Sequence, residues 1–527
     1  MEHPLLQPVT AAYEEYLRDE SRAVGQAEAI AFPRDEAEVR AVLRAAADAH
    51  MPVTLQGART GLAAAAVPGG GLVLNLGKLD AVKGMAQEKD GTFTLRVQPG
   101  LALSRLRKQI ADRRFDTTGW DVASLAAYDA FMAAEEQFLP TDPTETSASV
   151  GGMAACNASG ARSYLYGPMR RHVRGLRVLL AGGDSLTLRR GQVRAKGRHL
   201  ALVTDAGRRL DVPLPTYEMP KTKNASGYYI ADDMDAVDLF VGSDGTLGVI
   251  TEVELALCPL PKVIWGASCF FAEEAAALDF VIGLRGQSLA QVAAMEYFDA
   301  RALDILRRQK RDNPAFAALP PIAPQYSAAV YVELHCASED EAAEALFATG
   351  TAMEAAGGRA QDSWVARTDF DKDTLIFFRH AVPESVNMMI DTRRKAHPGI
   401  TKLGTDMAVP GAYLKEAMAM YHGMLAEAGL EYAIWGHIGD NHLHVNILPQ
   451  SQADYEQGKA LYAQWAQRVC AWGGSVSAEH GVGKLKADTL RVMVGDAGVR
   501  QMAALKACFD PRGLLGVGTM FSPMGGI

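Results

Sequence analysis

The sequence predicts an α+β protein with at least two domains, and three observations favour this fold class. The segment RDEAEVRAVLRAAADAH has a helical pattern and is followed at once by the strand-like PVTLQG. Two further loops rich in glycine and small residues, TSASVGGMAACNASGA and VGSDGTLGVITEVELAL, precede the segment ALCPLPKV, whose two prolines indicate a boundary near residue 260. Beyond it, helical and strand-like patterns both occur, which predicts a second α+β domain.

The first unit is an αβ pair that ends in a glycine-rich loop. One helical face carries Val39, Val42, Leu43 and Ala46, and Asp35 is placed to cap the helix. Glycine permits close backbone approach, so such loops can present N–H groups to a phosphate or pyrophosphate, although many are simply turns. None of the three loops has the spacing of a dinucleotide-binding fingerprint or of a P-loop.

The rest of the chain divides by composition. Residues 116–138 are polar and helix-prone, and we expect them to form an insertion or a lid. Beyond residue 260, FAEEAAALDFVIGLRG and DEAAEALFATGTAMEAAGG predict helices, while AAVYVELH alternates like a strand. We therefore expect an N-terminal extension (1–26), a first domain (27–259) and a second domain (260–527).

The segment WGHIGDNHLHVNIL holds three histidines within eight residues. Its alternation predicts a half-buried strand with His442, His444 and Asn446 on one face. If Asp440 and Asn441 form a two-residue hairpin loop, His437 lies opposite His444, about 5 Å away. A histidine on a strand is more often a hydrogen-bonded core or surface residue than a ligand. Together with the distant acidic residue in GGSVSAEHGVGK, Glu479, the pair nevertheless predicts a His, His, carboxylate site of the kind that binds catalytic zinc.

Composition excludes several classes of function. The chain has 527 residues, 53 basic and 62 acidic side chains and a net charge of −9, so a nucleic acid partner is not expected. It shows neither a secretion signal nor a stretch that could span a bilayer, so membrane contact would be peripheral. Six single cysteines without a C-x-x-C pair suit a cytoplasmic protein without an iron–sulfur cluster.

Six motifs, taken in order, resemble a known family. They are PVTLQGARTGLAAAAVP, the segment from PTDPTETSASVGGMAACNASGA to LLAGG, KNASGYYIADDMDAVDLFVGSDGTLGVITEVEL, GHIGDNHLHVNIL, GGSVSAEHGVGK and KACFDPRGLLGVG. Their order is similar to that of FAD-linked 2-hydroxyacid dehydrogenases in the vanillyl-alcohol oxidase superfamily, which include D-lactate and D-2-hydroxyglutarate dehydrogenases and the glycolate oxidase flavin subunit. The resemblance runs from about residue 31 to residue 521.

The resemblance implies a PCMH-type FAD-binding domain of two subdomains and a C-terminal cap domain with an antiparallel sheet. The last ~45 residues would return to the FAD domain. The residues implied to contact FAD are Gln56, Gly57, Ala58, Arg59, Thr60, Gly61, Leu62, Asp142, Ser147, Gly151, Gly152, Asn157, Asp244, Thr246, Gly248 and Ile250.

The resemblance also implies a reaction. A divalent metal, with zinc expected, would be held by His437, His444 and Glu479. His480 would take the hydroxyl proton of a D-lactate-like 2-hydroxy acid while hydride passes from C2 to flavin N5. The substrate would also contact Arg379, a carboxylate clamp, and Asn446 and Lys402. Electrons would pass to a separate acceptor: a quinone, a cytochrome, an electron-transfer flavoprotein, an iron–sulfur protein or oxygen.

Several residues depart from the family pattern. Pro383 replaces a threonine and Gly404 a lysine that would bind a second carboxylate, which disfavours 2-hydroxyglutarate as the substrate. His442 stands where asparagine is usual, and Asp244 where glutamate is usual. Two other classes stay open: a metal-dependent hydrolase without flavin, and a non-redox flavin transferase such as an ether-lipid synthase.

Overall fold

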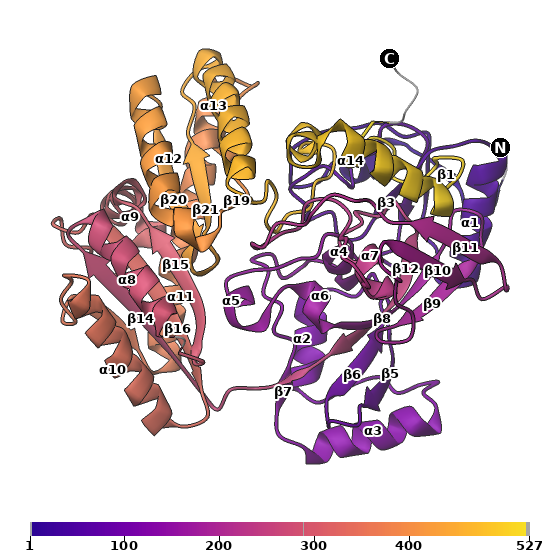
Figure 1. The fold of residues 1–527 in the computed structure, drawn as a ribbon, viewed down its shortest axis with the longest axis horizontal. Helices are drawn as coiled ribbons and strands as arrows, with labels where there is room; N and C mark the ends of the chain where they lie inside the picture. Colours follow the sequence, from indigo (N-terminus) through magenta and orange to yellow (C-terminus); the bar gives the residue numbers. More distant parts are fainter. Residues whose placement is uncertain (1–2, 288, 523–527) are drawn as a thin grey trace.

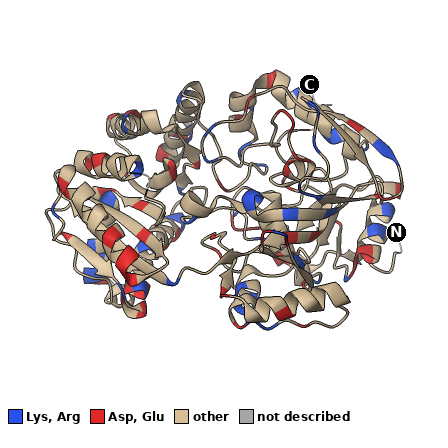
Figure 2. Ribbon diagram, turned by 60° about the horizontal axis from the view of Figure 1, so that its bottom comes forward, with Lys and Arg blue, Asp and Glu red and all other residues tan. Residues whose placement is uncertain are grey.

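The computed structural model describes residues 3–287 and 289–522 as two bodies that lie side by side (Figure 1). The N-terminal body holds the indigo and magenta part of the chain, and an extended segment after β13 (Cys258–Pro259) leads into the C-terminal body. The C-terminal helix α14 (Ala487–Phe509) lies with the N-terminal body. Acidic and basic residues are mixed over both bodies (Figure 2). Within the described ranges, no helix is long and apolar enough to cross a membrane.

The N-terminal body contains two main sheets, which confirms the α+β prediction. The first sheet has the order β1-β2-β4-β3 and the second the order β5-β6-β12-β8-β9. The strands of the first sheet are β1 (Gln7–Pro8), β2 (Ala29–Ala31), β3 (Val53–Gln56) and β4 (Leu72–Asn75). Those of the second are β5 (Val82–Gln87), β6 (Phe93–Val97), β8 (Val173–Leu179), β9 (Ser185–Arg189) and β12 (Val249–Ala256). The hairpin of β10 (His199–Val203) and β11 (Arg209–Pro213) stands apart.

Helix α1 (Glu36–Asp48) forms as its pattern predicts. The four apolar side chains of its predicted face are buried, and the Asp35 carboxylate accepts a hydrogen bond from the Glu38 N–H at 2.8 Å. The remaining helices of this body are α2 (Leu103–Ala111), α3 (Val122–Ala133), α4 (Val150–Ala155), α5 (Ser163–Tyr166), α6 (Met169–His172) and α7 (Ala236–Phe240).

Residues 116–138 do not cover the cavity described below. Helix α3 packs on β5, where Phe131 is buried in the main core of the N-terminal body. The strand after it, β7 (Gln137–Phe138), pairs with β13. No residue of this segment lines the cavity, so the structure gives no support to a lid.

The C-terminal body is built on an eight-stranded sheet. Seven strands follow the order β17-β14-β16-β15-β20-β21-β18, and β19 also pairs with β21. The strands are β14 (Val263–Phe271), β15 (Val292–Phe298), β16 (Ala328–Cys336), β17 (Ser363–Ala366), β18 (Leu403–Gly404), β19 (Met407–Ala408), β20 (Tyr432–His437) and β21 (His442–Ile447). Neighbouring strands of this sheet are antiparallel, as the resemblance implies.

Helices cover both faces of this sheet. One face packs against α8 (Glu274–Gly286), α10 (Glu339–Ala355), α12 (Leu414–Ala428) and α13 (Gln452–Ala471). The other packs against α9 (Ala300–Asp312) and α11 (Asp369–Arg394). Strand β16 forms as predicted, but it is buried along its whole length because both faces are covered.

The predicted hairpin register is wrong. His437 pairs with His442, and Trp435 pairs with His444. The chain between the two strands makes a short 3-10 turn over residues 438–440 and then places Asn441 in the left-handed region, at φ 51°. This four-residue connection shifts the pairing by two residues, and the three histidines therefore stay on one face. The strand is also buried on both faces rather than half-buried.

The end of the chain packs on the N-terminal body. Leu515 pairs with Val53 beside β3 and belongs to the core of the first sheet, together with Leu43 and Leu74. Met502 and Phe509 of α14 enter the core of the second sheet. The described part of the chain therefore begins and ends in the N-terminal body, and the residues between form the C-terminal sheet.

Candidate active site

A cavity of about 870 Å³ lies where the N-terminal loops meet the C-terminal sheet. From the N-terminal body it is lined by the predicted cofactor residues Gln56, Gly57, Ala58, Arg59, Thr60, Gly61, Leu62, Gly151, Gly152, Asp244, Gly248 and Ile250. From the other side it is lined by Arg379, Lys402, His437, His444, Asn446, Glu479 and His480. The structure thus brings most of the predicted site residues to one cavity, although they come from separate segments of the chain.

Four predicted cofactor residues lie behind the lining. The Asp142 carboxylate pairs with Arg107 at 3.1 Å, and the Ser147 N–H donates to Glu145 at 2.8 Å. Asn157 accepts a hydrogen bond from the Arg170 N–H at 2.9 Å. The hydroxyl of Thr246 donates to the Ser243 carbonyl at 2.7 Å. In this structure the side chains of Asp142, Asn157 and Thr246 and the backbone N–H of Ser147 support the loops.

The loop after β3 is suited to an anion. Within the described part of the chain, the N–H groups of Arg59, Thr60, Gly61 and Leu62 have no hydrogen-bond acceptor. Successive free N–H groups that line a concave surface are the usual cradle of a phosphate. The facing loop needs glycine at position 151, because a Cβ there would lie 2.3 Å from a Pro99 side-chain atom. These loops fit the pyrophosphate of FAD.

Asp244 joins this loop region to the C-terminal segment. Its carboxylate accepts hydrogen bonds from the N–H groups of Val482 and Gly483, both at 2.9 Å. Burial raises the pKa of Asp244 to about 6. The side chain therefore ties the loop of the first domain to the segment that carries Glu479.

Three histidines and one carboxylate meet at the other end of the cavity. Donor atoms of His437, His442, His444 and Glu479 all lie within 4.8 Å of one another. Nε2 of His437 lies 3.3 Å from the Glu479 carboxylate, and Nε2 of His444 lies 3.5 Å from it. These residue types and distances fit a divalent metal ion such as zinc.

The outer ring nitrogens of His437 and His444 are held by hydrogen-bond acceptors. Nδ1 of His437 lies 2.6 Å from the Glu296 carboxylate, and Nδ1 of His444 lies 3.0 Å from the Thr405 carbonyl. Such contacts fix the tautomer that leaves Nε2 free to bind a metal. Burial alone would lower the pKa of His437, but the Glu296 carboxylate raises it to about 9.

Lys223 is a charged neighbour that the sequence did not reveal as a site residue. Its side chain is 5 % exposed, and its ammonium group lies 2.9 Å from the Glu479 carboxylate. Burial opposes the charge of Glu479, but Lys223 and His437 hold its pKa well below the usual range. Glu479 is therefore an ionised, buried carboxylate. The only sequence signal for Lys223 is its position at the start of the KNASGYY motif.

Asp406 is a second residue that sequence reasoning did not assign to the site. It is 2 % exposed and lies 2.9 Å from His442 Nε2 and 3.3 Å from His480 Nδ1. Burial would raise its pKa, but His480 and Lys486 hold it well below the usual range. Asp406 thus anchors two histidines at once. Glu296, in β15, is a third residue that sequence reasoning did not assign to the site, because no local sequence pattern indicates its role.

His480 lies at the edge of the cluster and faces the cavity. Its ring stacks on His444 with centroids 5.9 Å apart, and Nε2 lies 3.4 Å from the Glu479 carboxylate. Its side chain is 29 % exposed, in contrast to the buried His442. A histidine held on one side by a carboxylate and open to a cavity on the other can accept a proton.

Arg379 supplies a partly buried positive charge to the same cavity. It projects from α11, where its guanidinium lies 3.9 Å from Glu296 and over the ring of Tyr331, 5.0 Å from the centroid. Asn446 donates to the His444 carbonyl at 2.8 Å. Burial lowers the pKa of Lys402 to about 8. All three side chains could contact an anionic substrate.

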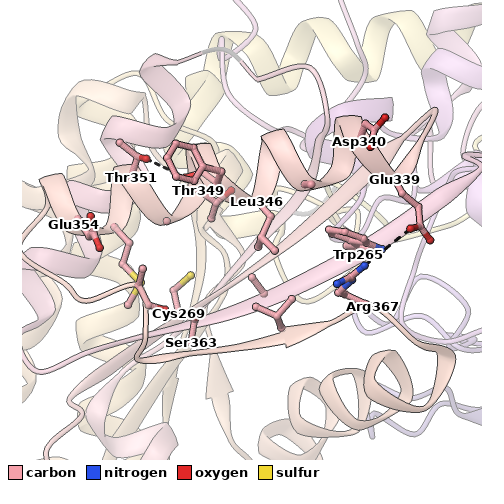
Figure 3. A pocket seen from close by; sticks show the side chains of 17 residues that line it. Trp265, Cys269, Glu339, Asp340, Leu346, Thr349, Thr351, Glu354, Ser363 and Arg367 are labelled. Atoms are coloured by element: carbon pink, nitrogen blue, oxygen red, sulfur yellow. Dashed lines mark hydrogen bonds and ion pairs between the residues drawn. The ribbon is translucent and has the colours of Figure 1, made fainter.

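A second cavity, of about 580 Å³, lies between α10 and the strands β14 and β17 (Figure 3). There the Arg367 guanidinium lies 4.3 Å from the ring centroid of Trp265 and 4.0 Å from the Glu339 carboxylate. No predicted site residue lines this second cavity. The chemistry-bearing residues are thus concentrated in the first cavity.

Comparison with known proteins supports the cofactor. Residues 260–520 match the family described as FAD linked oxidases, C-terminal domain, and residues 27–125 and 123–189 match an FAD binding domain. The chain belongs to the FAD-linked oxidases. The resemblance noted in the sequence is therefore confirmed at the level of the family.

The relatives of this FAD-linked oxidase cover nearly the whole chain. A D-2-hydroxyglutarate dehydrogenase of Xanthomonas citri pv. viticola is 30% identical over 507 residues, 94% of this chain and 89% of the relative. A protein named "Probable D-lactate dehydrogenase, mitochondrial", from Danio rerio, is 27% identical over 513 residues, 97% of this chain and 87% of the relative. The chain is thus an FAD-linked oxidoreductase of the 2-hydroxyacid dehydrogenase type.

A solved structure shares the fold of this FAD-linked oxidase. Alkyldihydroxyacetonephosphate synthase aligns with a TM-score of 0.63 at 13% sequence identity, covering 97% of this chain and 82% of that chain. At this identity the likeness concerns the fold alone.

Proposed function

We propose that this FAD-linked oxidoreductase converts a D-2-hydroxy acid of the D-lactate type to the 2-oxo acid. The observation that carries the proposal is the position of the histidine cluster and Arg379 in the same cavity as the free N–H groups of residues 59–62. The same cavity therefore holds the histidine cluster, which would bind the substrate hydroxyl, Arg379, which would bind the substrate carboxylate, and the loop at residues 59–62, which would bind FAD.

Each residue has a part in the proposed reaction. Arg379 holds the substrate carboxylate, because a guanidinium offers paired donors with fixed geometry. His480 takes the proton of the substrate hydroxyl, and Asp406 beside its Nδ1 stabilises the charge that results. Asn446 and Lys402 line the wall that the rest of the substrate would touch.

Two bound groups supply the remaining chemistry. The loops at residues 56–62 and 142–157 and the Asp244–Ile250 segment would hold FAD, which would supply the acceptor for the hydride from C2 of the substrate. His437, His444 and Glu479 would hold a divalent cation, which would lower the pKa of the substrate hydroxyl. The two electrons then leave to a separate acceptor protein or quinone.

An anaerobic absorbance titration tests the proposal. The protein is mixed with D-lactate, L-lactate, glycolate, D-malate or D-2-hydroxyglutarate, before and after chelation. We expect a D-2-hydroxy acid to bleach the flavin band, with loss on chelation and recovery on addition of Zn²⁺. A yellow protein that none of these acids reduces would contradict the proposal and favour a non-redox flavin transferase. A colourless protein without FAD affinity would favour a hydrolase.

A further inference from the structure

His442 is the histidine of the cluster that the proposed metal set leaves unused. It stands directly opposite His437 in the ladder, and its ring centroid lies 5.4 Å from that of His437 and 4.5 Å from that of His444. Its side chain is fully buried. It therefore occupies the centre of the cluster.

The two ring nitrogens of His442 face different groups. Nε2 lies 2.9 Å from the Asp406 carboxylate, and Nδ1 lies 3.8 Å from the Glu479 carboxylate. The alignment with Asp406 is poor, so within the described residues neither ring nitrogen makes a well-formed hydrogen bond. A buried imidazole with both nitrogens unsatisfied is costly unless another partner binds it.

The three histidines share one arrangement around Glu479. In each ring one nitrogen faces an oxygen on the outer side, from Glu296, Asp406 or Thr405, and the other nitrogen faces Glu479. The inner nitrogen is Nε2 in His437 and His444 and Nδ1 in His442. This is the pattern of histidines that bind a metal through one ring nitrogen while an oxygen of another residue accepts a hydrogen bond from the other ring nitrogen.

We propose that His442 supplies, through Nδ1, a fourth protein ligand to the metal ion of this site. The inference rests on the proposed function for the presence of that ion. The ion would be held by three imidazoles and the Glu479 carboxylate, and substrate oxygens would have to bind as additional ligands in an expanded coordination shell. Asp406 would then position His442 and His480 together.

The test compares His442→Asn with His422→Asn in the FAD-loaded protein. His422 is a matched control, because it also contacts a carboxylate, Glu274 at 2.9 Å, but lies outside the cluster. The dissociation constant for Zn²⁺ is measured by competition with a chromogenic chelator, and the number of imidazole ligands by X-ray absorption at the zinc edge. Flavin content reports whether each variant folds.

We expect His442→Asn to weaken Zn²⁺ binding by ~10-fold to 100-fold and to reduce the number of imidazole ligands by one. We expect His422→Asn to change neither the Zn²⁺ affinity nor the number of imidazole ligands. Unchanged affinity and an unchanged imidazole count in folded His442→Asn would overturn the inference while leaving the proposed function intact. A wild-type protein that binds no Zn²⁺, yet is still reduced by a hydroxy acid, would overturn the inference and the metal part of the function together. Absence of flavin reduction with the expected Zn²⁺ data would support the inference and contradict the proposed oxidation.

Discussion

Nδ1 of His437 lies 2.6 Å from the carboxylate of Glu296, a residue 141 positions earlier in the chain. The contact fixes the ring so that Nε2 faces Glu479. We expect Glu296→Gln to weaken Zn²⁺ binding by ~10-fold to 100-fold, because the ring loses a charged acceptor that raises its basicity. Glu274→Gln is the matched control, since Glu274 holds His422 in the same way outside the cluster. Equal Zn²⁺ affinities in the two variants would contradict the role of Glu296.

Arg379→Lys should raise KM for the hydroxy acid by about 10-fold to 100-fold, because an ammonium group cannot make the paired hydrogen bonds of a guanidinium. Flavin content should not change. Arg393→Lys on the same helix is the control, because Arg393 pairs with Glu431 and does not line the cavity. Steady-state kinetics measure both variants. A rise in KM of the same size in the two would show that the helix, rather than the clamp, is responsible.

His480→Gln should slow flavin reduction by about 10²-fold to 10⁴-fold, because glutamine cannot accept the hydroxyl proton. Rapid mixing under anaerobic conditions measures the rate. Chemical reduction by dithionite should proceed as in the wild type, since it needs no base from the protein. The hypothesis fails if the substrate reduces this variant at the wild-type rate.

Gly61→Glu should reduce FAD affinity. A side chain at residue 61 meets no atom closer than the Asp19 carboxylate, at 3.9 Å from the Cβ position, so glutamate fits and adds a negative charge beside the free N–H groups. Gly61→Gln has the same size without the charge. We expect FAD to bind about 10-fold more weakly to the glutamate variant, with a smaller difference at high salt. Fluorescence titration of the apoprotein gives both constants, and equal values would place the pyrophosphate elsewhere.

Asp299→Asn should alter how stability depends on pH. Asp299 caps α9 by accepting from the Ala302 N–H at 2.7 Å, and burial raises its pKa to about 7. Between the ordinary pKa of about 4 and this value, the folded protein binds more protons than the unfolded chain, so stability falls as pH rises. Asparagine keeps the cap without the charge.

We therefore expect Asp299→Asn to raise the free energy of unfolding by about 1–3 kcal/mol at pH 8 and to leave it nearly unchanged at pH 4. Urea denaturation at several pH values measures it. A difference between variant and wild type that stays constant from pH 4 to pH 8 would show that Asp299 does not titrate in this window.

Local pattern was sufficient for much of the fold. Helix α1, its cap and its buried face follow from the spacing of apolar residues, and the same holds for α8, α10 and β16. These elements depend on near neighbours in the chain, whose preferences can be read directly. The order of the six motifs likewise indicated the family.

The register of the histidine hairpin did not follow from its sequence. Asp440 and Asn441 suit a two-residue turn, yet the chain uses a four-residue connection. Asn441 lies under α8, where its side chain accepts a hydrogen bond from Arg285 at 2.5 Å. A contact made by a distant helix thus stabilises a loop that local preference does not select.

The sequence by itself determined the α+β class, the main helices, the family and most of the predicted site residues that the fold brings to one cavity. Only the tertiary structure decided that His442 joins His437 and His444, and that Lys223, Glu296 and Asp406 surround them. The physical reason is that buried charges are stable only beside partners that satisfy them. Those partners lie between 36 and 256 positions along the chain from the residues that they contact, and their meeting depends on the packing of whole domains.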